Sequence, residues 1–193
     1  MHPAGNQWRL SSSLPLAALV LSLAVGSWGV FAGLLKLVHS SFELLPMDVA
    51  LVLATPAATG LILYWPLHLW AVTSTHPGGV LMLLFLALTP TLAGLTLASN
   101  LTHLLLVGVG MSLVPGCFAA GVIYLHRLTG IPGALLTGSL LVLCLLGAVF
   151  AYASTPVISE AFGWRLTPLM SIVLIAIAAG LFAALSEPAE PPE

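Results

Sequence analysis

Long stretches without a charged side chain are the feature that most constrains this chain. Its 193 residues include only 4 Lys or Arg and 6 Asp or Glu, and all of these lie between or outside six apolar stretches. A helix needs about 20 apolar residues to cross the ~30 Å hydrocarbon layer of a bilayer, where backbone groups find partners only within the helix. A charge at the centre of such a helix costs about 3 kcal/mol. The charge distribution therefore predicts an all-α integral membrane protein.

The predicted architecture has six transmembrane spans joined by short connections. The spans are 14–35, 49–72, 80–98, 104–125, 131–158 and 166–185. Residues 1–13 are expected to form an N-terminal segment, and the acidic, proline-rich residues 186–193 a disordered tail. The first span is too long for the apolar region of a secretory signal, so we expect it to be retained. An even number of spans places both termini on one side of the membrane.

The composition excludes several classes of protein. Charged residues make up 5% of the chain, against about 25% in a soluble domain, which excludes a soluble enzyme. Binding of nucleic acid would need a basic surface, and a disordered chain would have fewer apolar residues. The sequence also has no Ser/His/Asp grouping, no paired carboxylates within a span, no phosphate-binding glycine loop and no metal-ligand spacing of its two cysteines. We expect neither an enzyme nor a bound metal or organic cofactor.

Prolines and glycines recur inside the predicted spans. A proline removes a backbone hydrogen bond, and transporters use such breaks to bend helices or to open backbone groups to a cavity, although proline is also common in membrane helices in general. The glycines include a GxxxG step at Gly29 and Gly33, which favours close packing of helices. The prolines concerned are Pro56, Pro66, Pro90, Pro115 and Pro156.

His68 is the one ionisable residue well inside a predicted span. It follows Tyr64 by four residues, which places both side chains on one face of a helix. Histidines within membranes line ion or proton paths because the imidazole changes charge near neutral pH. The alternative is an interfacial histidine, since His68 lies near the end of its span beside Trp65 and Trp70.

Counting basic residues does not orient the spans. Arg9 and Arg127 are expected on the side of the termini, whereas Lys36 and Arg165 are expected on the other side. The positive-inside rule therefore gives a tie of two against two.

Five short segments of the chain carry distinctive motifs. They are 28–31 (WGVF), 53–60 (LATPAATG), 64–66 (YWP), 116–127 (GCFAAGVIYLHR) and 160–165 (EAFGWR). These segments resemble the nitrate/nitrite porter branch of the major facilitator superfamily, in which a W-x-x-F step in the first helix is followed by L-x-L-P-x-x-T-G in the second, G-x-S-F-A-x-G in the fourth, and E-x-x-G-W-R before the sixth. They occur in the family's order from the first predicted span to the start of the sixth.

The resemblance implies the N-terminal half of a carrier. Members of the superfamily have twelve helices in two halves, with the substrate bound at the midplane between them. The chain would then pair with itself or with a second half, with both termini cytoplasmic and the bundle in a cell inner membrane. When the helix faces are matched to those of the family, the resemblance implies a substrate path lined by four residues. These residues are Trp28, Phe31, Tyr64 and His68. Transporters of this branch need no cofactor, so none is expected here.

The sequence differs from this family at the residues with which the family binds nitrate. Tyr64 stands where the family has its substrate-binding arginine, and a phenol supplies neither a fixed positive charge nor a bidentate fork. The segment 68–79 lacks the acid and the arginines of the family's cytoplasmic loop, and 138–147 lacks the asparagines of its nitrate signature. We therefore expect the chain to keep the helical scaffold of the family but to have lost its nitrate-binding site.

Three functions therefore stay open. The first is a half-size transport protein for a neutral, weakly charged or proton-coupled solute. The second is a non-transporting accessory or structural subunit that uses the same faces to bind a larger membrane complex. The third is a truncated gene product without a function, which would fail to accumulate in the membrane.

Overall fold

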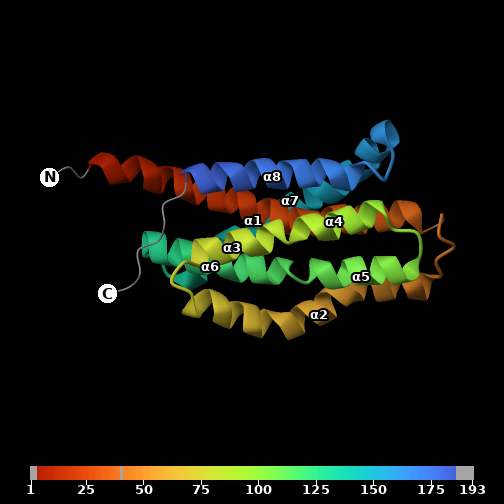
Figure 1. Ribbon diagram of the computed structural model, residues 1–193, viewed down its shortest axis with the longest axis horizontal. Helices are drawn as coiled ribbons and strands as arrows, with labels where there is room; N and C mark the ends of the chain where they lie inside the picture. Colours follow the sequence, from red (N-terminus) through yellow and green to blue (C-terminus); the bar gives the residue numbers. More distant parts are fainter. Residues whose placement is uncertain (1–3, 40, 186–193) are drawn as a thin grey trace.

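The computed structural model describes residues 4–39 and 41–185, which form an elongated bundle of helices that run along its longest axis (Figure 1). Within these residues, all regular structure is helical. The helices are α1 (Ala4–Val38), α2 (Pro46–Thr73), α3 (Pro77–Leu86), α4 (Leu88–Thr96), α5 (Leu101–Met111), α6 (Val114–Thr129), α7 (Gly133–Phe162) and α8 (Thr167–Leu185).

Six membrane-length spans are confirmed in the described part of the chain. Helices α1, α2, α7 and α8 are each one span, α3 and α4 together form the third, and α5 and α6 together form the fourth. Apart from the start of α1 at Ala4, the observed helix limits lie within four residues of the predicted span limits. The prediction of an all-α protein with six spans is correct.

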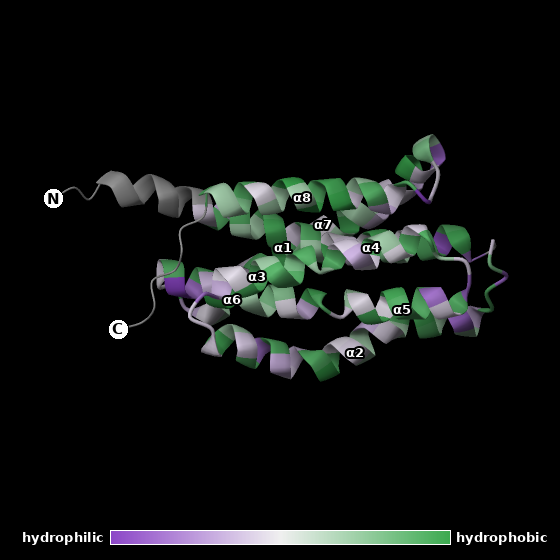
Figure 2. Cartoon of the chain, viewed as in Figure 1, coloured by the Kyte–Doolittle hydropathy of each residue, from purple (hydrophilic) through white to green (hydrophobic). Residues whose placement is uncertain are grey.

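The two ends of the bundle carry the polar residues. Figure 2 shows hydrophobic residues along the helices and the most hydrophilic ones mainly at both ends of the bundle. Helix α1 begins and α8 finishes at the same end (Figure 1), as an even number of spans requires. Because α1 begins at Ala4, helix extends into the segment predicted to precede the first span. The tail 186–193 lies outside the described residues.

Prolines divide two of the spans. The third span is interrupted at Ala87, just before Pro90, and the fourth at Ser112 and Leu113, just before Pro115. A proline cannot donate to the carbonyl four residues earlier. Pro90 thus frees the Leu86 carbonyl, which instead accepts a hydrogen bond from the hydroxyl of the neighbouring Thr89 at 2.7 Å.

The other prolines leave their helices continuous. Pro56 and Pro66 lie inside α2, which is visibly bent (Figure 1), and Pro156 lies inside α7. Helix bending of this kind is the usual effect of proline within a helix. Prolines therefore bend α2 and interrupt the third and fourth spans.

Helix α1 is the centre of the bundle. It packs most extensively against α7 and also against α8 and α6, and 67% of the residues in its most apolar part are buried. Helix α2 packs against α5 and α6, whereas α3 lies on α6 and α4 lies between α5 and α8. Helices α2 and α7 are the least buried, with 17% of the corresponding residues buried in each.

Glycines bring α1 and α7 into direct backbone contact. A side chain at Gly29 would collide with the carbonyl oxygen of Ala148, and one at Gly33 would press on Thr155 at 2.9 Å. Gly147 of α7 lies in the same way against the Ser22 backbone of α1. The packing role predicted for the GxxxG step is confirmed.

Candidate functional site

The middle of the bundle holds a hydrogen bond between the first and fourth spans. The indole Nε1 of Trp28 donates to the carbonyl oxygen of Met111 at 2.9 Å. In an unbroken helix, residue 115 would donate to this carbonyl, but Pro115 has no N–H. Trp28 therefore supplies the hydrogen bond that Pro115 removes, and it does so at the place where α5 ends and α6 begins.

A small pocket lies beside this hydrogen bond, between α1 and α2. It has a volume of about 150 Å³, and it is lined on one side by Trp28 and Phe31. Leu53, Pro56 and Ala57 of α2 form most of the opposite wall. No charged side chain lines it, and the one N–H of the indole is already engaged with Met111. Such a pocket suits a small neutral or apolar molecule.

Close contacts between prolines and glycines join α2 to the broken fourth span. Pro115 lies 3.4 Å from the position that a side chain at Gly60 would take. On the same face of α2, Pro56 lies 3.5 Å from the corresponding position at Gly108. The bend in α2 and the interruption between α5 and α6 therefore lie directly against each other, close to the middle of their spans.

Tyr64 and His68 form a separate aromatic group on α2. Their rings stack at 5.6 Å with an interplanar angle of 13°, and the Trp65 ring lies 6.4 Å from the imidazole. Tyr64 is 42% exposed and Trp65 is 64% exposed, so this group lies at the outside of the bundle. The imidazole Nδ1 of His68 is buried and has no hydrogen-bond partner among the described residues.

The structure brings together only two of the four predicted path residues. Trp28 and Phe31 line the same pocket with Pro56, whereas Tyr64 follows Pro56 by eight residues on α2. Eight residues of helix correspond to about 12 Å. Tyr64 therefore lies roughly two turns, and His68 roughly three turns, nearer the end of the bundle where α1 begins. A single continuous path through all four stays a prediction.

Arg127 secures the connection between the second and third spans. Its guanidinium donates to the carbonyl oxygens of Ser74 at 2.8 Å and Val72 at 2.6 Å. Both carbonyls lie at the end of α2, where no N–H group of the helix is available to donate a hydrogen bond to them. The arginine at the end of α6 thus holds α2 at the end of the bundle where both termini of the described chain lie.

Sequence reasoning missed the Met111 carbonyl and the part played by Pro115 in this site. The available signal was a proline inside the fourth span, which predicts a free carbonyl four residues earlier. It does not identify the donor, because Trp28 lies 83 positions away. Lys36 and Tyr152, which line a larger pocket at the end of α1, were also not recognised as a group.

The His, Cys, Asp and Glu side chains of the described residues do not form a cluster. No group of three or more His, Cys, Asp or Glu side chains lies close enough together in residues 4–39 and 41–185. Cys117 and Cys144 are both buried and free.

The fold and this site define a multi-pass, all-helical membrane protein with a broken helix at its centre. No protein-family model matches the chain, and neither does any curated protein or solved structure with which it was compared.

Proposed function

We propose that this chain is one lobe of a carrier, a half-size transport protein related to the major facilitator superfamily, which acts as a dimer or with a second lobe. The observation that carries this proposal is a symmetry in the packing of the spans. The most extensive contacts of spans one to three follow the same pattern as those of spans four to six.

The symmetry relates specific pairs of helices. The contact of α1 with α7, between spans one and five, corresponds to that of α5 and α6 with α2, between spans four and two. The contact of α1 with α8 corresponds to that of α5 and α6 with α3 and α4. Because each repeat has three spans, equivalent spans run in opposite directions. Inverted repeats of three spans are the building plan of each six-helix half in this superfamily.

The centre of the bundle supports transport in a second way. Substrate sites in such carriers lie near the membrane midplane, beside interrupted helices. Trp28 and Phe31 line the pocket of about 150 Å³ between α1 and α2, and the Trp28 indole also donates to Met111 at the Pro115 interruption. The pocket has no charged side chain, which favours a neutral or weakly charged solute over nitrate.

The second lobe would cover α2 and α7. These two helices hold equivalent places in the symmetry and are the least buried, with 17% of the residues in their most apolar parts buried. Tyr64 and His68 lie on the outward part of α2, and a second copy of the chain would enclose them in the path. In this arrangement, both termini are cytoplasmic and the protein lies in a cell inner membrane. It is not an enzyme, and it needs no cofactor and no nucleic acid.

Flux into sealed vesicles tests the proposal. Purified protein is reconstituted, and the entry of urea, glycerol and nitrate is compared with that into empty vesicles. We expect entry of a neutral solute, reduced at least tenfold by Ala57→Phe, which fills the central pocket. Ala176→Phe, at an exposed position of α8 that lies outside the pocket and outside α2 and α7, is the matched control and is expected to retain flux.

Two results would contradict this function. One is a rate equal to that of empty vesicles for all three solutes. The other is equal flux in Ala57→Phe and Ala176→Phe. Nitrate entry through a Tyr64→Phe protein without a partner would contradict the loss of the nitrate site.

A non-transporting subunit is the second candidate, and the chemistry of the central pocket favours it. The pocket's indole N–H is already used to complete the backbone at Met111, which leaves little with which to recognise a polar solute. Purification in mild detergent separates the two candidates. A dimer of this chain alone that a solute stabilises supports a carrier, whereas constant recovery with a larger membrane complex supports a subunit.

A further inference from the structure

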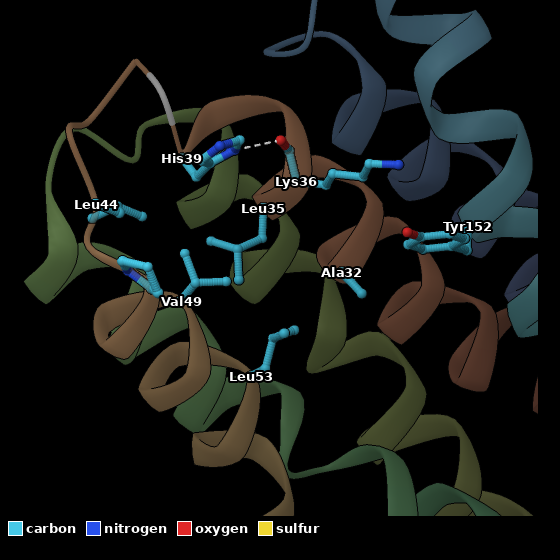
Figure 3. A pocket seen from close by; sticks show the side chains of 9 residues that line it. Ala32, Leu35, Lys36, His39, Leu44, Val49, Leu53 and Tyr152 are labelled. Carbon is cyan, nitrogen blue, oxygen red and sulfur yellow. Dashed lines mark hydrogen bonds between the residues drawn. The ribbon is translucent and has the colours of Figure 1, made fainter.

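A pocket of about 440 Å³ opens where α1 ends and α2 begins (Figure 3). Leu35, Val49 and Leu53 form an apolar wall between the two helices. Lys36 and Tyr152 are both drawn at one side of the pocket in Figure 3, and both line it. The volume lies within the range of ligand pockets, roughly 300–1,000 Å³.

Lys36 differs from the other basic side chains that the structure describes. Arg127 donates to two backbone carbonyls, and the Arg165 guanidinium lies 5.0 Å from the centre of the Trp164 ring. The ammonium of Lys36 forms neither a hydrogen bond nor an ion pair with any described residue. A lysine is therefore left with its positive charge unpaired at the edge of an apolar pocket.

Nearby groups do not neutralise this charge. Glu43 lies in the connection after α1 and Asp48 in the first turn of α2, but neither carboxylate forms an ion pair with Lys36. Asp48 Oδ2 instead accepts a hydrogen bond from the Leu45 backbone N–H at 3.0 Å, where it caps α2. His39 is occupied through Nδ1, which lies 2.6 Å from the Lys36 carbonyl oxygen.

The depth of the pocket matches the boundary of a bilayer. Lys36 precedes the end of α1 by two residues, which places it at the level of the headgroups. Ala32 lines the pocket one helical turn deeper, and Leu53 lies about two turns inside α2. The charge therefore lies at the polar level, and the apolar wall extends from it towards the hydrocarbon.

We propose that this pocket binds a phospholipid with an anionic headgroup. The phosphate pairs with the Lys36 ammonium and accepts a hydrogen bond from the Tyr152 hydroxyl, while one acyl chain lies along Leu35, Val49 and Leu53. A free inorganic anion would leave the apolar wall unused, and a zwitterionic lipid would bring its own cation to compete with Lys36. The proposal is independent of transport, since a carrier lobe and an accessory subunit would both hold such a lipid.

Native mass spectrometry of the intact protein in a neutral detergent tests this site. The protein is mixed with equal amounts of phosphatidylglycerol and phosphatidylcholine that have the same acyl chains, and the bound lipids are counted. We expect about a fivefold preference for phosphatidylglycerol, the contribution of one lysine at an anionic surface. The preference is expected to disappear in Lys36→Gln and to persist in Lys36→Arg.

Further variants separate the charge from the pocket. Arg165→Gln removes a positive charge at the same end of the bundle but outside the pocket, so the preference is expected to remain. Val49→Phe fills the pocket without changing any charge and is expected to reduce binding of both lipids. Tyr152→Phe is expected to weaken phosphatidylglycerol binding about threefold through the lost hydrogen bond. Gel filtration of each variant confirms that the bundle is folded.

Three outcomes would overturn the proposal. The first is equal binding of both lipids to the unaltered protein. The second is a preference that survives Lys36→Gln or that Arg165→Gln abolishes. The third is competition by glycerol phosphate or inorganic phosphate as effective as that by the whole lipid, which would make the pocket a site for small anions.

Discussion

The two equivalent helix contacts of the bundle are built differently. Helices α1 and α7 meet through glycines, with Gly29 directly against the Ala148 backbone and Gly33 against Thr155. The symmetry-equivalent contact, between α2 and the fourth span, contains a bent helix and an interruption at Pro115. We expect the first contact to be the more rigid, because backbones touch there, whereas the second depends on a helix that a proline interrupts.

The largest effect is expected at the rigid contact. Gly29→Leu places a side chain against the Ala148 carbonyl oxygen and must push α1 and α7 apart, which we expect to cost about 3 kcal/mol. Thermal unfolding in detergent measures it. Gly138→Ala and Gly180→Ala, where nothing lies within 4 Å of the added carbon, are the controls and should not lower stability. Equal effects at all three glycines would remove the distinction between the two contacts.

A smaller loss is expected from Trp28→Phe at the interrupted contact. This change leaves the buried Met111 carbonyl without a donor, which costs about 2 kcal/mol. Pro115→Ala restores an N–H four residues after Met111, so Trp28→Phe should cost much less in that background. A double-mutant cycle of unfolding measures the coupling. Additive losses would show that Trp28 does not compensate for the proline.

Arg127→Gln tests the end of the same contact. The variant loses the charged hydrogen bonds to Val72 and Ser74. We expect this loss to cost about 1.5 kcal/mol, mainly as local opening of the connection between α2 and α3. Hydrogen exchange of the backbone amides of residues 72–76 measures this local opening. Arg165→Gln, whose side chain lies over Trp164 instead, serves as the control and should leave this segment unchanged.

The smallest effect is expected at the turn between α7 and α8. Gly163 has a φ of 85° and a ψ of 145°, a conformation that side chains disfavour. No atom lies within 4 Å of a carbon added at this position. Gly163→Ala is therefore expected to cost about 1 kcal/mol through backbone strain alone. Thermal unfolding checks this value, and a loss as large as that of Gly29→Leu would contradict a purely local effect.

The spans could be predicted from the sequence, whereas most of the site could not. Charges are costly in lipid, so the positions of Lys36, Asp48, Arg127 and Arg165 mark where helices leave the membrane. The GxxxG step at Gly29 likewise predicted a close helix contact. Both signals are local, and each depends on a strong and simple energetic penalty.

The arrangement at the centre depends on contacts between distant residues. Pro115 indicates a missing N–H, but nothing in its neighbourhood identifies Trp28 as the replacement donor. The same limit applies to Tyr64 and His68, which stack on each other but lie more than two helical turns along α2 from Pro56. A pattern within one helix predicts which residues share a face and not which helices that face meets.

The central place of α1 also has a consequence for biogenesis. The most extensively packed helix is made before the other spans of this bundle, and the glycines of its face meet α7, the fifth span. At ordinary translation rates, this partner follows on the order of ten seconds later. We therefore expect the insertion machinery to hold α1 until α7 has been made.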